Sequence, residues 1–111
     1  MISSAEEARL VLNKWKADSS RVVGFASSAT LGFSARVGGT ITKSDDIGAT
    51  FCLASATDFI FFNLPGVIGY GEQQELADSL SQAIANEVQK WTTILFLKYA
   101  NGERLVLCSM D

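Results

Sequence analysis

The chain has 111 residues, of which 48% are hydrophobic and 19% are charged, and its nine basic and twelve acidic side chains give a formal net charge of −3. This length indicates a single domain, residues 1–111, with a core large enough to need neither a disulfide nor a metal. The absence of histidine removes the commonest general acid–base and metal ligand, and the charge balance argues against an extended nucleic-acid footprint.

The first residues lack the basic region and apolar run of a signal peptide, and no apolar stretch reaches the roughly 18–20 residues that span a bilayer. We therefore expect a cytoplasmic protein without membrane contact. Two isolated cysteines, Cys52 and Cys108, cannot form a four-thiolate zinc site, and both lie in strand patterns that predict buried thiols. We expect no metal, no cofactor and no enzymatic activity, because no nucleophile with an adjacent base can be identified.

The N-terminal segment predicts a helix. The run Ser4-Ala5-Glu6-Glu7 has the form of a capping box, and the helix is expected to end near Ala17–Ser19. Its apolar residues share one stripe at helical spacing, so Trp15 is predicted to lie in the core rather than in a ligand site. The stripe consists of Ala8, Val11, Leu12 and Trp15.

Two-residue alternation dominates the next part of the chain. A short strand at Val22–Phe25 and a turn at Ala26–Ala29 are expected to precede a hairpin over Leu31–Leu53, whose odd positions are apolar and predicted to be buried. Gly38-Gly39 indicates a bulge, a close backbone approach or a bend, of which we favour the bend. Asp45-Asp46 is typical of the turn between the two strands, an interpretation that we favour over a cation site.

A fourth strand is expected from Thr57 to Leu64, but there the alternation fails because Phe59, Ile60, Phe61 and Phe62 are all large and apolar. A strand that is apolar on both faces must be covered on both, by a second layer, the far wall of a curled sheet or another subunit. The following loop, Pro65–Gly71, is interpreted as a packed connector, with a lid or a partner contact as the alternatives.

A second amphipathic helix is predicted from Glu72 to Gln89, followed by a C-terminal hairpin of Thr92–Tyr99 and Arg104–Met110. Asn101-Gly102 between these strands predicts a two-residue type I′ turn. That turn would place Leu97 opposite Val106 and Phe96 opposite Leu107. One face would then carry Leu95, Leu97, Tyr99, Val106 and Cys108, and the other would carry Ile94, Phe96, Leu105 and Leu107.

The predicted fold class is α+β, in the order helix, four-stranded antiparallel meander, helix and C-terminal β-hairpin. We expect a strongly curved antiparallel sheet covered by two helices, either as an open sheet or as a small barrel of Sm-like or SH3-like form.

The run Gly39-Thr40-Ile41-Thr42-Lys43-Ser44-Asp45 resembles the Gly-Thr-Leu and Asp segment of Sm-like proteins, which are small RNA-binding barrels that form rings. The resemblance implies a curled sheet. It does not extend to that family's RNA-binding residues, since the usual Met-Asn and Arg-Gly segments have no counterpart here. The predicted topology also resembles the small acidic dimeric chaperones of type III secretion.

Three functional hypotheses follow. A self-associating interaction or regulatory module leads, because a small domain with this composition has surplus apolar surface. It would act as a homo-oligomer, most simply a dimer, or with another protein partner. The alternatives are a small-ligand-binding protein with an apolar pocket between helix and curved sheet, and an Sm-like nucleic-acid binder. The candidate interface residues are Phe59, Phe61, Val67, Ile68, Tyr70, Ile94, Phe96, Leu105 and Leu107.

Overall fold

The computed structural model of the protein describes residues 4–28, 33–43, 50–70 and 90–110. In this part of the chain one α-helix precedes seven β-strands, and a short 3-10 turn, η1, joins the last two strands. The elements are α1 (Ala5–Asp18), β1 (Val22–Ser28), β2 (Phe33–Lys43), β3 (Thr50–Ala54), β4 (Phe59–Asn63), β5 (Val67–Tyr70), β6 (Thr93–Tyr99), η1 (Ala100–Gly102) and β7 (Glu103–Ser109).

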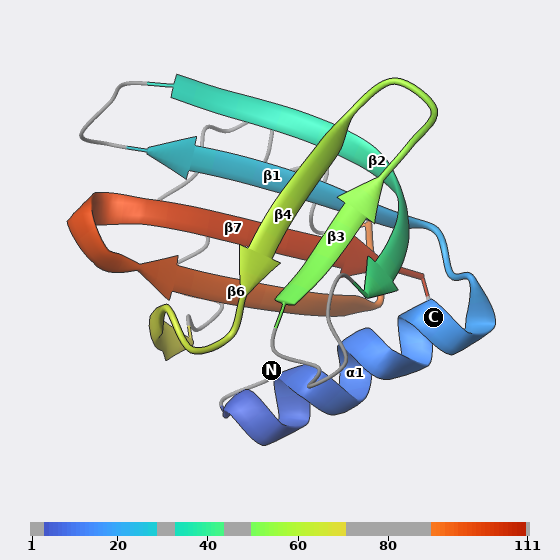
Figure 1. Cartoon of the computed structure of the whole chain (residues 1–111), viewed down its shortest axis with the longest axis horizontal. Coiled ribbons are helices and arrows are strands. Elements are labelled where there is room, and N and C mark those ends of the chain that lie inside the picture. Colours follow the sequence, from blue (N-terminus) through green and yellow to red (C-terminus); the bar gives the residue numbers. More distant parts are fainter. Residues whose placement is uncertain (1–3, 29–32, 44–49, 71–89, 111) are drawn as a thin grey trace.

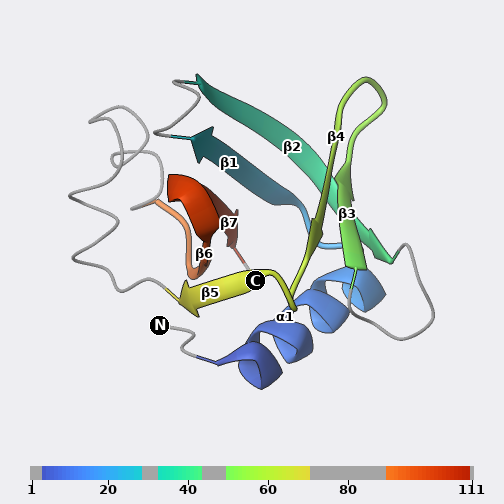
Figure 2. The same ribbon diagram turned by 60° about the vertical axis from the view of Figure 1, so that its left-hand side comes forward.

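The seven strands form one antiparallel sheet in the order β4-β3-β2-β1-β7-β6-β5. The sheet is strongly curled, so that β3 and β4 run steeply across the direction of β1 and β7 (Figure 1). After rotation of the view the sheet is seen as a half-barrel, and α1 lies across its lower opening (Figure 2). The predicted α+β class with a strongly curved antiparallel sheet is thus present.

The helix α1 is capped at both ends as its sequence indicates. The Ser4 hydroxyl accepts a hydrogen bond from the Glu7 amide at 3.2 Å. Ser19 closes the other end in the left-handed conformation, with φ 52°. Trp15 is 1% exposed and packs in the core together with Ala8 and Leu12, which confirms the role predicted for the tryptophan.

The strand β2 changes partners at a bend. It pairs with β1 up to Gly39 and with β3 from Thr40 onward, and its ribbon curves at this point (Figure 1). A side chain at Gly39 would collide with the carbonyl group of Ala54. The predicted bend is therefore present, and the close backbone approach that was the alternative to it occurs at the same residue.

The alternation over β2 and β3 places one set of side chains in the interior. Val37, Ile41, Phe51 and Leu53 are all buried and belong to the main core with α1, as predicted for the odd positions. Ala35, whose exposure is also described, departs from this pattern and is exposed, because it lies near the end of β2 that is remote from α1 (Figure 1).

A second buried cluster lies on the opposite face of the sheet, where β1, β6 and β7 are adjacent. Its members are Val23, Phe25, Phe96, Val106 and Cys108. The central strands are thus apolar on both faces, as strands covered on both sides must be. Both cysteines are buried, as their strand patterns predict.

The predicted turn of the C-terminal hairpin is wrong, because the loop is one residue longer than expected and the strand register is shifted by one residue. Of its central residues only Gly102 has a positive φ, at 77°, whereas a type I′ turn requires two. The connection is the three-residue η1, and Phe96 therefore pairs with Val106 and Leu97 with Leu105. This shift exchanges the two faces of β7, so that Leu105 points into the main core and Val106 into the second cluster.

Two further boundaries differ from prediction. The strand β1 continues to Ser28, through most of the expected turn, because its pairing with β2 and β7 continues that far. Val67–Tyr70 is not a connector but the edge strand β5, which pairs with β6 after a tight turn at Leu64–Gly66. The helix predicted at residues 72–89 and the turn at Asp45-Asp46 lie outside the described residues.

Candidate functional site

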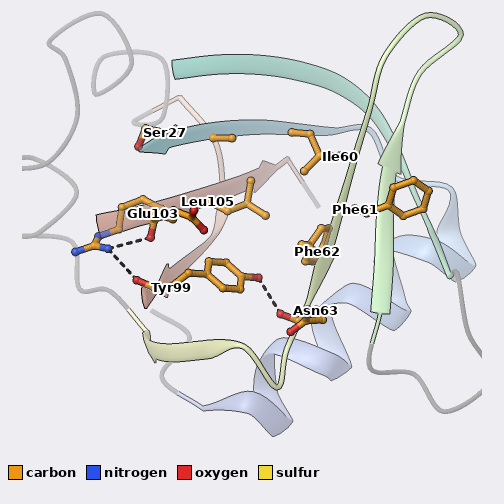
Figure 3. Close-up of a pocket in the computed structure, with 10 residues that line it drawn as sticks. Ser27, Ile60, Phe61, Phe62, Asn63, Tyr99, Glu103 and Leu105 are labelled. Carbon is orange, nitrogen blue, oxygen red and sulfur yellow. Dashed lines mark hydrogen bonds between the residues drawn. The ribbon is translucent and has the colours of Figure 1, made fainter. Parts of the chain in front are cut away.

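The strand β4 has two faces with opposite roles. Phe59 and Phe61 point outward and are 65% and 60% exposed. Ile60 is half-buried and Phe62 is buried, with its ring stacked on Phe51 at a centroid distance of 5.9 Å. Figure 3 shows Ile60 and Phe62 on the inner side of β4 and Phe61 directed away from it. Alternation within the strand is therefore present, although four successive residues, Phe59 to Phe62, are apolar.

The two exposed rings form a small aromatic surface, which we call the outer patch and define as Phe59 and Phe61. Their rings meet edge to face at 5.2 Å between centroids. The residues opposite them on β3 are Ala54 and Cys52, whose small side chains leave both rings standing above the sheet. Single exposed apolar side chains are common on protein surfaces, whereas adjacent exposed aromatic side chains are typical of interaction sites.

Among the described strands β4 and β5 form the two edges of the sheet, and only β5 shows the usual protection against edge-to-edge pairing. The strand β5 is short, has an irregular register between Val67 and Gly69, and is overlaid by the Lys98 side chain. Such bulges and lysines discourage the addition of a further strand. Phe59–Asn63 contains no charge, no proline and no bulge.

The inner face of β4 forms one wall of a cleft of about 400 Å³, a volume typical of small-molecule sites. The opposite wall comes from β1 and β7, and Tyr99 from the end of β6 lies across the base in the view of Figure 3. The predicted pocket lay between helix and sheet, but no residue of α1 lines this one. The lining residues are Ala26, Ser27, Ile60, Phe61, Phe62, Asn63, Tyr99, Glu103, Arg104 and Leu105.

Hydrogen bonds hold the cleft in shape. The Tyr99 hydroxyl donates to the Asn63 carbonyl at 2.9 Å, and the Asn63 side-chain oxygen accepts from the Gly66 amide, so that β6 is tied to the end of β4. The Arg104 guanidinium donates to the carbonyl groups of Glu103 at 2.9 Å and of Tyr99 at 3.5 Å (Figure 3). These bonds hold the Arg104 side chain, which lines the cleft, against the turn of the C-terminal hairpin.

Burial determines the electrostatics of the two tyrosines near this site. It raises the pKa of the Tyr99 phenol well above its usual range, and the nearby Tyr70 phenol adds to the shift. Burial also raises the pKa of Tyr70, whose hydroxyl is buried without a hydrogen-bond partner among the described residues. Both phenols are therefore neutral at physiological pH and can act only as hydrogen-bonding groups.

The candidate interface residues from the sequence divide into three groups. Phe59, Phe61 and Ile68 are exposed, and Val67, Tyr70 and Ile94 are half-buried. Phe96, Leu105 and Leu107 are at most 4% exposed and belong to the core, which corrects their assignment to an interface. Leu105 and Leu107 pack in the main core and Phe96 in the second cluster, so side chains on both faces of the closing hairpin are buried within the chain.

The cleft itself was not predicted from the sequence. Asn63 and Tyr99 are 36 positions apart, and no local pattern signals that their strands meet at one corner of a curled sheet.

In the described part of the chain no three His, Cys, Asp or Glu side chains gather as a metal site would require. None of the helical segments described there is long and apolar enough to cross a membrane. Comparisons of the chain with protein families, curated proteins and solved structures gave no match.

Proposed function

We propose that this protein is a non-catalytic interaction module that associates with itself through the outer patch on β4. The observation that carries the proposal is the exposure of Phe59 and Phe61, at 65% and 60%, on an unprotected edge strand. Aromatic side chains are enriched at protein interfaces, and an open strand edge can add a further strand through main-chain hydrogen bonds.

The size of the outer patch indicates a weak complex. A Phe side chain buries about 150–250 Å² when it is fully enclosed, so the two exposed rings of two copies would bury at most on the order of 450 Å². At about 25 cal/mol per Å² this contributes roughly 11 kcal/mol. The loss of translational and rotational freedom opposes it by about 4–15 kcal/mol. We therefore expect a dimer that dissociates at micromolar concentrations rather than a permanent one.

Sedimentation velocity over a concentration series tests this proposal. The mass is expected to rise from 11.9 kDa toward twice that value, and Phe61→Asp is expected to keep the protein monomeric. Leu10→Asp is the matched control, because Leu10 is 64% exposed but lies on α1. A monomer at every concentration would refute the proposal, as would equal dissociation by the two variants.

The cleft supports a second candidate function, the binding of a small molecule. Its walls combine the apolar side chains of Ile60, Phe62 and Leu105 with hydrogen-bonding groups such as the Tyr99 hydroxyl. Sites of this kind take ligands with an apolar body and a few polar atoms. Regulation of self-association is then a natural role, since β4 contributes to both the cleft and the outer patch.

A thermal-shift screen against small amphipathic metabolites tests this second function. A ligand at about 100 times its dissociation constant stabilises the folded state by about 2.7 kcal/mol, which a melting curve detects readily. Ala26→Leu fills part of the cleft and is expected to abolish the shift, whereas Phe59→Asp is expected to preserve it, because Phe59 lies on the outer face and does not line the cleft. A screen without any shift, or a shift that survives Ala26→Leu, would count against the cleft.

A further inference from the structure

The sequence of β4 has a symmetry that defines how two copies would pair. Phe59 and Phe61 lie on one face at equal distances from Ile60. When two antiparallel strands are related by a twofold axis through the midpoint between opposing residues, each side chain lies beside one that points to the same face. An axis beside Ile60 therefore brings each exposed aromatic ring next to an aromatic ring of the other copy.

We infer that the occupant of the β4 edge is a second copy of this chain, paired antiparallel so that Ile60 lies opposite Ile60 of the partner subunit. This inference rests on the proposed self-association and defines its geometry. Phe59 then lies beside Phe61 of the partner subunit, and Phe61 beside Phe59 of the partner subunit. The two sheets join into one continuous sheet across a twofold axis perpendicular to it, the closed symmetry of most homodimers.

Other registers of the two β4 strands form fewer contacts between the exposed aromatic side chains. A shift of the axis to Phe61 would place Phe59 opposite the polar Asn63 of the partner subunit and leave only one aromatic pair. Turning the partner over would bring its half-buried inner side chains to the outer face, since a one-residue change of register reverses the faces. Both losses make the register centred on Ile60 the most favourable.

Charge at the joint agrees with a second copy as the occupant. Asp58 is the charged residue that immediately precedes β4, and the strand itself carries none. In the proposed register Asp58 lies opposite Phe62 of the partner subunit, so that the two aspartates stand at opposite ends of the joint. Like charges are therefore kept apart, and no cation is needed from the partner to neutralise this edge.

Cysteine cross-linking tests the register, because Cα atoms of directly opposite residues are about 4.5–5.5 Å apart and within the range of a disulfide. Ile60→Cys is expected to form a covalent dimer under mild oxidation. Phe61→Cys is the matched variant, since its two copies would be diagonal neighbours about 7–8 Å apart, beyond the reach of a disulfide. The unmodified protein, with Cys52 and Cys108 buried, measures the background.

Cross-linking by Ile60→Cys alone, well above background, supports the inference. Cross-linking by Phe61→Cys and not by Ile60→Cys overturns it in favour of an axis at Phe61. A dimeric mass without a cross-link from either variant overturns edge pairing but leaves self-association through the outer patch intact. A monomeric mass for the unmodified protein refutes both proposals, and the sedimentation measurement on the same samples distinguishes these last two results.

Discussion

Replacement of Gly39 by alanine tests the bend that closes the half-barrel. An alanine Cβ at this position would collide with the Ala54 carbonyl, which belongs to the backbone and cannot rotate away. Overpacking of this kind costs about 1–3 kcal/mol. Removing a glycine from a strand returns only about 0.5–1 kcal/mol. Because the obstacle is main chain rather than a flexible side chain, we expect a loss of about 2 kcal/mol, or on the order of 8 °C in melting temperature.

The neighbouring glycine provides the control. A Cβ at Gly38 would lie 3.2 Å from a guanidinium nitrogen of Arg21, whose side chain can move aside, and 4.0 Å from a methyl group of Val23, which is an ordinary contact. Urea denaturation followed by circular dichroism should therefore show a lower midpoint for Gly39→Ala and an almost unchanged midpoint for Gly38→Ala, with equal slopes. Equal midpoints for Gly39→Ala and the unmodified protein would refute the close approach of β3 to the bend.

Three further predictions concern the C-terminal hairpin and the tyrosines. Gly102→Val is expected to lower the stability by about 1–3 kcal/mol, because a β-branched residue is forced to a positive φ, and Gly102→Asn should lose much less in the same urea titration. Tyr99→Phe removes the hydrogen bond to Asn63 and should lower the stability by about 1 kcal/mol. Tyr70→Phe removes a buried hydroxyl that has no partner among the described residues and should be neutral or stabilising, so a loss of stability for Tyr70→Phe would contradict this contrast. Burial raises the pKa of the Tyr99 phenol in the folded protein, so the unfolded chain loses the phenol proton at a lower pH than the folded chain. The free energy of unfolding should therefore be constant below about pH 10 and decrease above it. The decrease should be less steep for Tyr99→Phe.

Local features of the fold could be predicted because their causes lie within a few residues. The Ser4 cap and the helical spacing of Ala8, Leu12 and Trp15 determine where α1 begins and which side is buried. Alternation over β2 and β3 identified the inner face, and Gly39 marked the bend. In the candidate site, the sequence indicated that Phe59 and Phe61 occupy one face of a strand with surplus apolar surface.

Long-range packing decided the rest. The register of the C-terminal hairpin depends on whether Asn101-Gly102 forms a two- or a three-residue loop, and the structure has the longer loop, with β7 paired to both β1 and β6. The strand order made β4 an edge of the sheet, and the curl of the sheet brought Asn63 to Tyr99, 36 residues away. The sequence by itself therefore determined which side chains share a face of each element. The pairing of distant strands determined which faces meet, because that choice depends on the packing of the whole core and not on any one segment.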